Sequence, residues 1–135
     1  MGLGLRLGGG TGRLNLIAHV EIPVRDLERA MAFYAAVFDI GFGDIVEIHG
    51  NRMAYFPFVP GAEGASAALA QGEVYVPTRD GAIVYFTVTD IDAVLARATD
   101  LGSAMLFPKT AVSDTSFVAE ISDSEGNRIA LQSQL

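Results

Sequence analysis

The chain of 135 residues contains no cysteine. Without thiols it can form no disulfide framework, no thiolate zinc site and no cysteine nucleophile. A chain without cysteine also fits a reducing compartment, so we expect a cytoplasmic protein.

Basic side chains and long apolar runs are scarce as well. Nine Lys and Arg residues stand against sixteen Asp and Glu residues, and the net charge of -7 would repel nucleic acid and anionic membrane surfaces. Every apolar run is far shorter than the roughly 20 residues needed to cross a bilayer. We therefore expect no nucleic-acid partner and no membrane partner, and we assign the hydrophobic residues to a globular core.

The opening of the sequence, residues 1–15, is rich in glycine and lacks the long apolar core of a secretory signal. We expect a flexible leader there, followed by one domain over residues 16–135.

Within this domain the sequence repeats itself once. Residues 19–37 match residues 83–101, and residues 63–69 (EGASAAL) match residues 125–131 (EGNRIAL). A solenoid needs three or more stacked units, so a repeat that occurs only twice indicates two similar halves instead. We place these half-modules at residues 16–70 and 82–133 and expect a connector over residues 71–81, which contain few periodic residues.

Each half-module is predicted to contain a strand, a helix and three further strands. Alternation over residues 16–24 predicts a strand, and the apolar spacing that follows predicts a helix that begins after Asp26 as N-cap and ends near Gly41. Asp90 has the same capping role in the second half, where Gly102 ends the helix. The remaining strands are expected over residues 44–48, 52–58, 66–70, 82–88, 104–107, 116–121 and 128–132.

A sheet covered by its helix on one face leaves its other face bare. Period-two alternation puts His19 and Glu21 on that bare face, and Ile83, Tyr85 and Thr87 on its counterpart in the second half. Two such faces brought together would enclose a cavity. The predicted fold class is α+β, with two βαβββ modules pairing into a curved mixed sheet around a cavity.

Several motifs carry a resemblance to a known superfamily. The pattern H-x-x-I-x-V-x-D-L precedes an A-x-x-F-Y helix, and D-x-E-G-N-R-I occurs near the end. The chain also contains Y-F-P-F, G-x-x-x-A-L and P-K-T. Over residues 17–133 this arrangement resembles the vicinal oxygen chelate superfamily, which includes glyoxalase I, bleomycin-resistance proteins, fosfomycin-resistance enzymes and extradiol dioxygenases. It looks most like the small glyoxalase-like proteins.

The resemblance implies four metal-ligand positions, two in each half. They map onto His19, Ala68, Ile83 and Ala130, and only the first of these residues can bind a metal. One imidazole does not hold a divalent ion stably, because such ions need several protein ligands. We therefore expect no metal and no other cofactor, and we expect the two alanines to leave room for a ligand.

The leading hypothesis is a glyoxalase-like protein that binds a small organic ligand in a mostly apolar cavity. We expect a homodimer, since these folds commonly pair, and the halves could close within one chain or between two chains. The residues predicted to contact the ligand are Tyr55, Ala68, Ile83, Tyr85, Ala130 and Gln132.

The alternative is a lyase or isomerase of the glyoxalase type. Here His19 and Glu21 would be the catalytic residues that move a proton next to a carbonyl. A divalent metal recruited by a displaced set of His19, Glu21 and Gln132 would remain compatible with this alternative. Glu21 also needs a partner, for which His19 or Tyr85 is the expected donor. Arg128, beside a turn, is expected to be a solvated surface charge.

Overall fold

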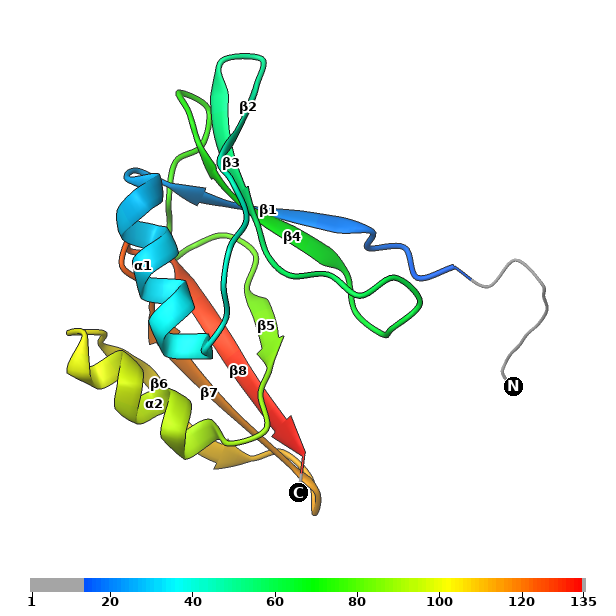
Figure 1. The fold of residues 1–135 in the computed structure, drawn as a ribbon. Coiled ribbons are helices and arrows are strands. Elements are labelled where there is room, and N and C mark those ends of the chain that lie inside the picture. Colours follow the sequence, from blue (N-terminus) through cyan, green and yellow to red (C-terminus); the bar gives the residue numbers. More distant parts are fainter. Residues whose placement is uncertain (1–13, 135) are drawn as a thin grey trace.

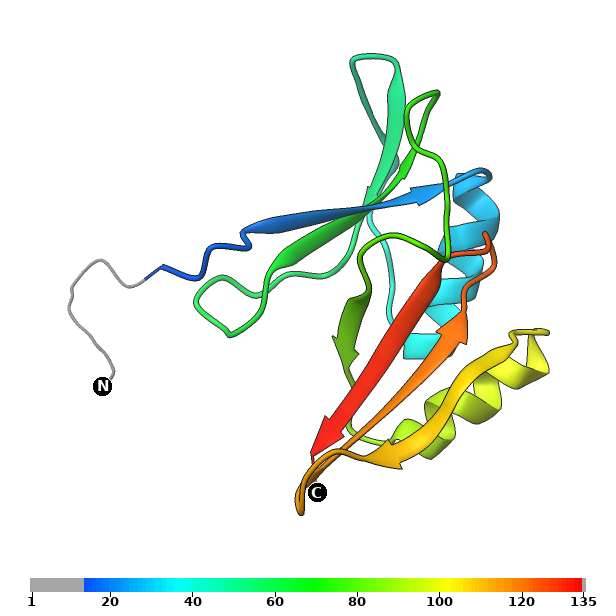
Figure 2. The ribbon, with the colours of Figure 1, turned by 180° about the vertical axis from the view of Figure 1, so that it is seen from behind.

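The computed structural model describes residues 14–134, which form two four-stranded sheets and two helices (Figure 1). Both helices lie on the same side of the molecule, and the view from behind shows the sheets without helices in front of them (Figure 2). This arrangement confirms the α+β prediction. The predicted leader lies outside the described residues except for its last two positions. Among the residues that the structure describes, no helix is long and apolar enough to span a membrane.

The first sheet has the strand order β1-β4-β3-β2 and is mixed, because β1 and β4 run parallel while the other neighbours run antiparallel. A turn at residues 49–50 joins β2 to β3 as a hairpin, with both turn residues at positive φ. The two hairpin strands are shorter than predicted. The elements of this half are β1 (His19–Val24), α1 (Leu27–Phe38), β2 (Val46–Ile48), β3 (Asn51–Tyr55) and β4 (Ser66–Gln71).

The second sheet repeats this topology with the order β5-β8-β7-β6, and here β5 and β8 are the parallel pair. The match between the halves confirms the inference drawn from the repeated sequence. The last strand is two residues longer than expected and β6 is four residues longer at its end. The elements are β5 (Val84–Thr87), α2 (Ile91–Asp100), β6 (Met105–Ala111), β7 (Ser116–Ser122) and β8 (Arg128–Gln134).

Aspartate side chains begin both helices as predicted. The Asp26 carboxylate accepts a hydrogen bond from the backbone N–H of Arg29 at 3.0 Å, and the Asp90 carboxylate accepts one from Ala93 at 3.1 Å. The predicted end of α1 at Gly41 is wrong, because the chain already turns at Asp39, which adopts a left-handed conformation with φ of 55°. Aspartate is one of the few residues that tolerate this region.

The core lies between the helices and the sheet faces that they cover. Ile22 and Val24 of β1 are buried there, and Val84 and Phe86 of β5 pack against the same cluster. The alternation predicted from sequence is therefore confirmed. Tyr34 of α1 is fully buried at the centre of an aromatic group that includes Phe38, Phe56 and Phe86.

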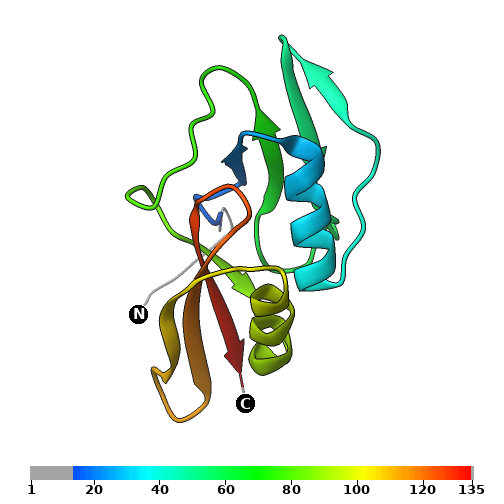
Figure 3. The same cartoon turned by 90° about the vertical axis from the view of Figure 1, so that its left-hand side faces the viewer.

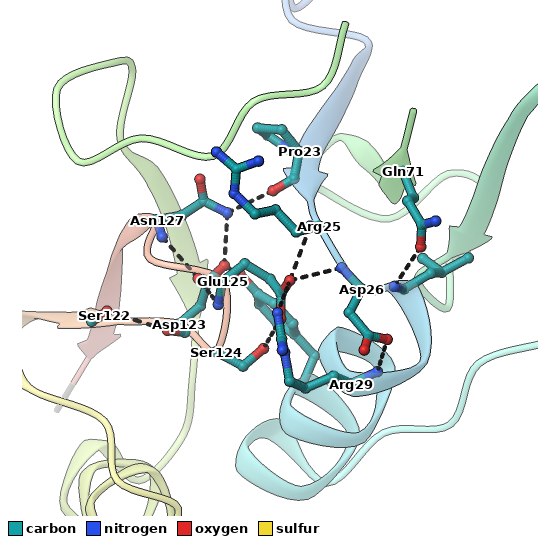
Figure 4. A network of polar contacts seen from close by, with 12 residues as sticks. Pro23, Arg25, Asp26, Arg29, Gln71, Ser122, Asp123, Ser124, Glu125 and Asn127 are labelled. Atoms are coloured by element: carbon teal, nitrogen blue, oxygen red, sulfur yellow. Dashed lines mark hydrogen bonds and ion pairs between the residues drawn. The ribbon is translucent and has the colours of Figure 1, made fainter. Parts of the chain in front are cut away.

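A loop in the second half clasps the start of α1 (Figures 3 and 4). This loop, residues 123–127, joins β7 to β8. The Glu125 carboxylate accepts hydrogen bonds from the backbone N–H groups of Arg25 and Asp26, both at 2.9 Å. It also accepts two from the Arg29 guanidinium, at 2.8 and 2.9 Å. We call residues 123–127 with these contacts the clasp.

The rest of the clasp fixes the loop itself. One oxygen of Asp123 accepts from the N–H groups of Glu125 and Asn127, and the other accepts from the buried Tyr34 hydroxyl at 2.7 Å. Asn127 donates to the carbonyl of Pro23 at 2.8 Å. The D-x-E-G-N motif therefore ties the two half-modules together and leaves their bare sheet faces available.

Candidate functional site

The residues predicted in the first half share the bare face of the first sheet. Glu21 of β1 lies opposite Ala68 of β4, which lies opposite Tyr55 of β3, so these three residues form one row across the sheet. His19 lies two residues before Glu21, with its ring centroid 6.0 Å from that of Tyr55. The side chains of His19, Glu21 and Tyr55 face solvent in the chain by itself.

The second sheet carries a matching row in reversed chemical order. Tyr85 of β5 lies opposite Ala130 of β8, which lies opposite Glu120 of β7. The first row is thus Glu, Ala, Tyr and the second is Tyr, Ala, Glu, both counted from the strand that begins the half-module. Gln132 lies on the same face opposite Thr87.

Large aromatic and aliphatic side chains are exposed on the bare faces of both sheets. Tyr85 is 51% exposed, Tyr55 is 42% exposed and Ile83, immediately before β5, is 37% exposed. Large apolar side chains that gather on an exposed face indicate a binding surface.

The two alanines do not leave the room that the sequence predicts. Ala68 and Ala130 both have no exposed surface, so their larger neighbours cover them. The open space lies beside the rows instead, where the halves meet.

Two grooves lie at this meeting of the halves, which we call the seam because residues of β1 and β5 line both grooves. The larger groove, of about 580 Å³, is lined by Ser66 and by Ile83, Tyr85 and Thr87. The smaller groove, of about 260 Å³, is lined by Glu21, Arg128 and parts of the connector. The seam therefore brings predicted residues from both halves to a common boundary.

His19 and Glu21 each have a separate polar partner. His19 Nδ1 lies 2.6 Å from the hydroxyl oxygen of Ser66, on the neighbouring strand. Glu21 accepts a hydrogen bond from the Tyr75 hydroxyl, also at 2.6 Å. The prediction that His19 or Tyr85 would be the donor to Glu21 is wrong, because the connector between β4 and β5 brings Tyr75 to this carboxylate.

The contact with Glu21 alters the acidity of Tyr75. Its hydrogen bond to the carboxylate raises the pKa of the Tyr75 phenol, and partial desolvation and the negative charge of Glu21 act in the same direction. Tyr75 is therefore a neutral donor to a charged acceptor. Sequence reasoning missed this residue because the connector has no periodicity that would assign its side chains to a face.

A second charge on the bare faces was also missed. Arg128 forms an ion pair with Glu120 across neighbouring strands of the second sheet, so it is not the solvated surface charge that the sequence suggested. The turn at residues 123–127 could have predicted this ion pair from sequence. It pairs Ser122 with Arg128 and Glu120 with Ala130, so the side chains of Glu120 and Arg128 lie on the same face of the sheet.

The residues at the four ligand positions that the resemblance implies do not fit a metal. Ala68, Ile83 and Ala130 offer no donor atom, and His19 is the only one of the four that does. Strand pairing does not bring together the alternative ligand set of His19, Glu21 and Gln132. Gln132 lies in the second sheet, whereas His19 and Glu21 lie in the first. Between residues 14 and 134, no three His, Asp or Glu side chains are grouped so that they could hold an ion.

Comparison with known proteins gives a consistent result. The sequence profile of the glyoxalase/bleomycin resistance protein/dioxygenase superfamily matches residues 16–131. No curated protein matches the chain.

Solved structures share the fold. The chain is similar to a glyoxalase family protein from Bacillus cereus, with 18% identity, a TM-score of 0.71 and coverage of 95% of this chain and 99% of that one. A glyoxalase/bleomycin resistance protein from Streptomyces sp. CB03234 has 27% identity and a TM-score of 0.62, with coverage of 85% and 97%. TnmS3, an antibiotic binding protein from the same organism, has 22% identity, a TM-score of 0.62, and coverage of 90% and 98%.

Proposed function

Because this chain belongs to the glyoxalase/bleomycin resistance protein/dioxygenase superfamily, we propose that it binds a small organic molecule at the seam and needs no metal to do so. The observation that carries the proposal is a combination. Three of the four ligand positions that the resemblance implies hold alanine or isoleucine, whereas the adjoining faces present exposed apolar and aromatic side chains.

The chemistry of the larger groove supports this function. Small-molecule sites are mostly apolar, with a few polar groups that fix orientation. Here Ile83 and Tyr85 supply apolar and aromatic surface, while Ser66 and Thr87 supply hydroxyl groups. The occurrence of an antibiotic binding protein among the structures of this fold is in keeping with such a role.

A second copy of the chain is part of the proposal. Phe58 and Phe107 are 51% and 40% exposed, in addition to the tyrosines of the two rows. A homodimer that brings the bare faces together would remove this apolar area from water and enclose the ligand. Light scattering coupled to size exclusion would give twice the chain mass at micromolar concentration; a monomer at all concentrations would contradict the dimer. A cytoplasmic location stays a prediction.

The test of the function is a calorimetric binding screen against hydrophobic and aromatic metabolites, with and without prior dialysis against EDTA. We expect at least one compound to bind equally well in both preparations. Tyr85→Ala should weaken that binding about tenfold, because it removes aromatic contact area. Leu101→Ala is the matched control, since Leu101 is also about half exposed but lies at the end of α2.

If the protein is an enzyme, the same protein samples should contain a bound metal or show catalytic turnover. Zinc, nickel, manganese or iron retained in stoichiometric amount, or turnover of hemithioacetals that His19→Ala abolishes, would overturn the proposed function. Failure of every compound in the screen to bind would also count against it.

A further inference from the structure

Building on the proposed function, we infer that the ligand carries one protonated amine, and that the Glu21 carboxylate recognises this group with Tyr75 beside it. The bare faces carry Glu21, Glu120 and Arg128, and Arg128 is paired with Glu120, so Glu21 has no ion-pair partner between residues 14 and 134. This unpaired carboxylate, together with the Tyr75 ring that contacts it, favours an organic cation with an apolar body.

Arg128 of β8 carries a positive charge on the bare face of the second sheet. Its guanidinium pairs with Glu120 on the second sheet, so these two charges compensate each other. Glu21 lines the smaller groove together with Arg128, yet it takes part in none of the ion pairs found between residues 14 and 134. Glu21 is therefore a groove-lining carboxylate whose charge no ion pair compensates in the described part of the chain.

The Glu21 carboxylate also has hydrogen-bond acceptor positions left for a ligand. A carboxylate has about four acceptor positions, and the only protein hydrogen bond described for this side chain comes from Tyr75. Arg128 is committed to Glu120, and His19 is bonded to Ser66. An ammonium group would add charge-assisted hydrogen bonds at the free positions of Glu21.

Two aromatic side chains near Glu21 favour the same class of ligand. Tyr75 contacts the carboxylate directly, and Tyr55 lies across Ala68, two strand spacings or about 10 Å away along the row. A cation bound to Glu21 would gain cation–π attraction from a tyrosine ring that lies within about 6 Å of it. The net charge of -7 raises the local concentration of cations around the whole molecule.

The sharpest test uses three compounds that share one ring system and differ in charge: 1-naphthylmethylamine, 1-naphthalenemethanol and 1-naphthoate. Calorimetry at pH 7.5 and low salt should show the amine binding about tenfold more tightly than the alcohol, and the carboxylate binding most weakly. Raising the salt to 0.5 M should narrow the difference between amine and alcohol, because the contact of Glu21 with the amine is partly exposed and therefore screened.

Substitutions test which residues cause the preference for the amine over the alcohol. Glu21→Gln should reduce the affinity for the amine to that for the alcohol. Asp100→Asn is the control, since it removes the same charge from an exposed position at the end of α2 and should leave the preference unchanged. Tyr75→Phe keeps the ring and should retain the preference, whereas Tyr75→Ala should lower amine affinity several-fold.

The outcomes separate this inference from the function on which it rests. Equal binding of the amine and the alcohol by the native protein, at both salt concentrations, would overturn the cation inference and leave small-molecule binding intact. Preference for the amine that survives Glu21→Gln would overturn the role of Glu21. Absence of binding by these compounds and by the whole metabolite panel would overturn the proposed function and the inference with it.

Discussion

Acid should weaken this fold through one particular carboxylate, Glu125 of the clasp. Its side chain is completely shielded from solvent, and it receives hydrogen bonds from the Arg29 guanidinium and from two backbone N–H groups. Burial by itself would raise the pKa of Glu125. The hydrogen bonds from Arg29, from the N–H of Asp26, from Ser124 and from the N–H of Arg25 outweigh burial and lower the pKa from 4.5 to about 2.

The sign of the effect follows from the depressed pKa. A carboxyl group that is more acidic in the folded than in the unfolded state stabilises the fold fully above the unfolded value, here 4.5. That contribution is lost as the pH falls through the folded value of about 2. The gap between 4.5 and about 2, at about 1.4 kcal/mol per pH unit, corresponds to roughly 3 kcal/mol.

Urea denaturation of the native protein and of Glu125→Gln, at intervals from pH 7 to pH 2.5, measures this contribution. We expect the variant to be less stable by roughly 3 kcal/mol at pH 7, and the two proteins to converge as the pH falls below 4.5. Comparison of the two proteins cancels the titration of the other carboxylates. A difference that stays constant from pH 7 to pH 2.5 would refute the assignment of this stability to the ionised form of Glu125.

Three further predictions concern other contacts. Tyr34→Phe removes the buried hydroxyl that donates to Asp123, and it should cost about 2 kcal/mol in the free energy of unfolding measured by urea, because the acceptor is charged and would lose a partner; an unchanged midpoint would contradict this. Asp26→Ala and Asp90→Ala each remove a helix N-cap and should each cost about 1 kcal/mol; unchanged stability of both would show that other groups satisfy the helix ends. Dialysis against EDTA should leave the thermal midpoint unchanged, since the ligand positions that the resemblance implies do not fit a metal; a fall that zinc reverses would refute that view.

The features that could be predicted from sequence are those fixed by local pattern. The repeat predicted the order of helices and strands in both halves, and alternation along β1 and β5 assigned His19, Glu21 and Tyr85 to the bare faces correctly. The capping aspartates followed from the residue type at the start of an apolar period. Each of these predictions depends only on the residue types within or next to one helix or strand.

What could not be predicted depends on segments that are distant in sequence. Tyr75 reaches Glu21 across 54 positions, from a connector whose path no pattern describes. The burial of Ala68 and Ala130 depends on which neighbouring side chains cover them, and the sequence does not state this. Whether a small residue leaves open space is therefore a question of tertiary packing.

The clasp also bears on the stability of the first half-module. Glu125 and Asp123 on a loop of the second half accept hydrogen bonds from the backbone N–H groups of residues 25 and 26 and from the Tyr34 hydroxyl in the first half. A fragment ending near Gln71 would leave the Tyr34 hydroxyl and two N–H groups without their acceptors. The first half-module therefore depends on the second for the acceptors of these buried and half-buried donors.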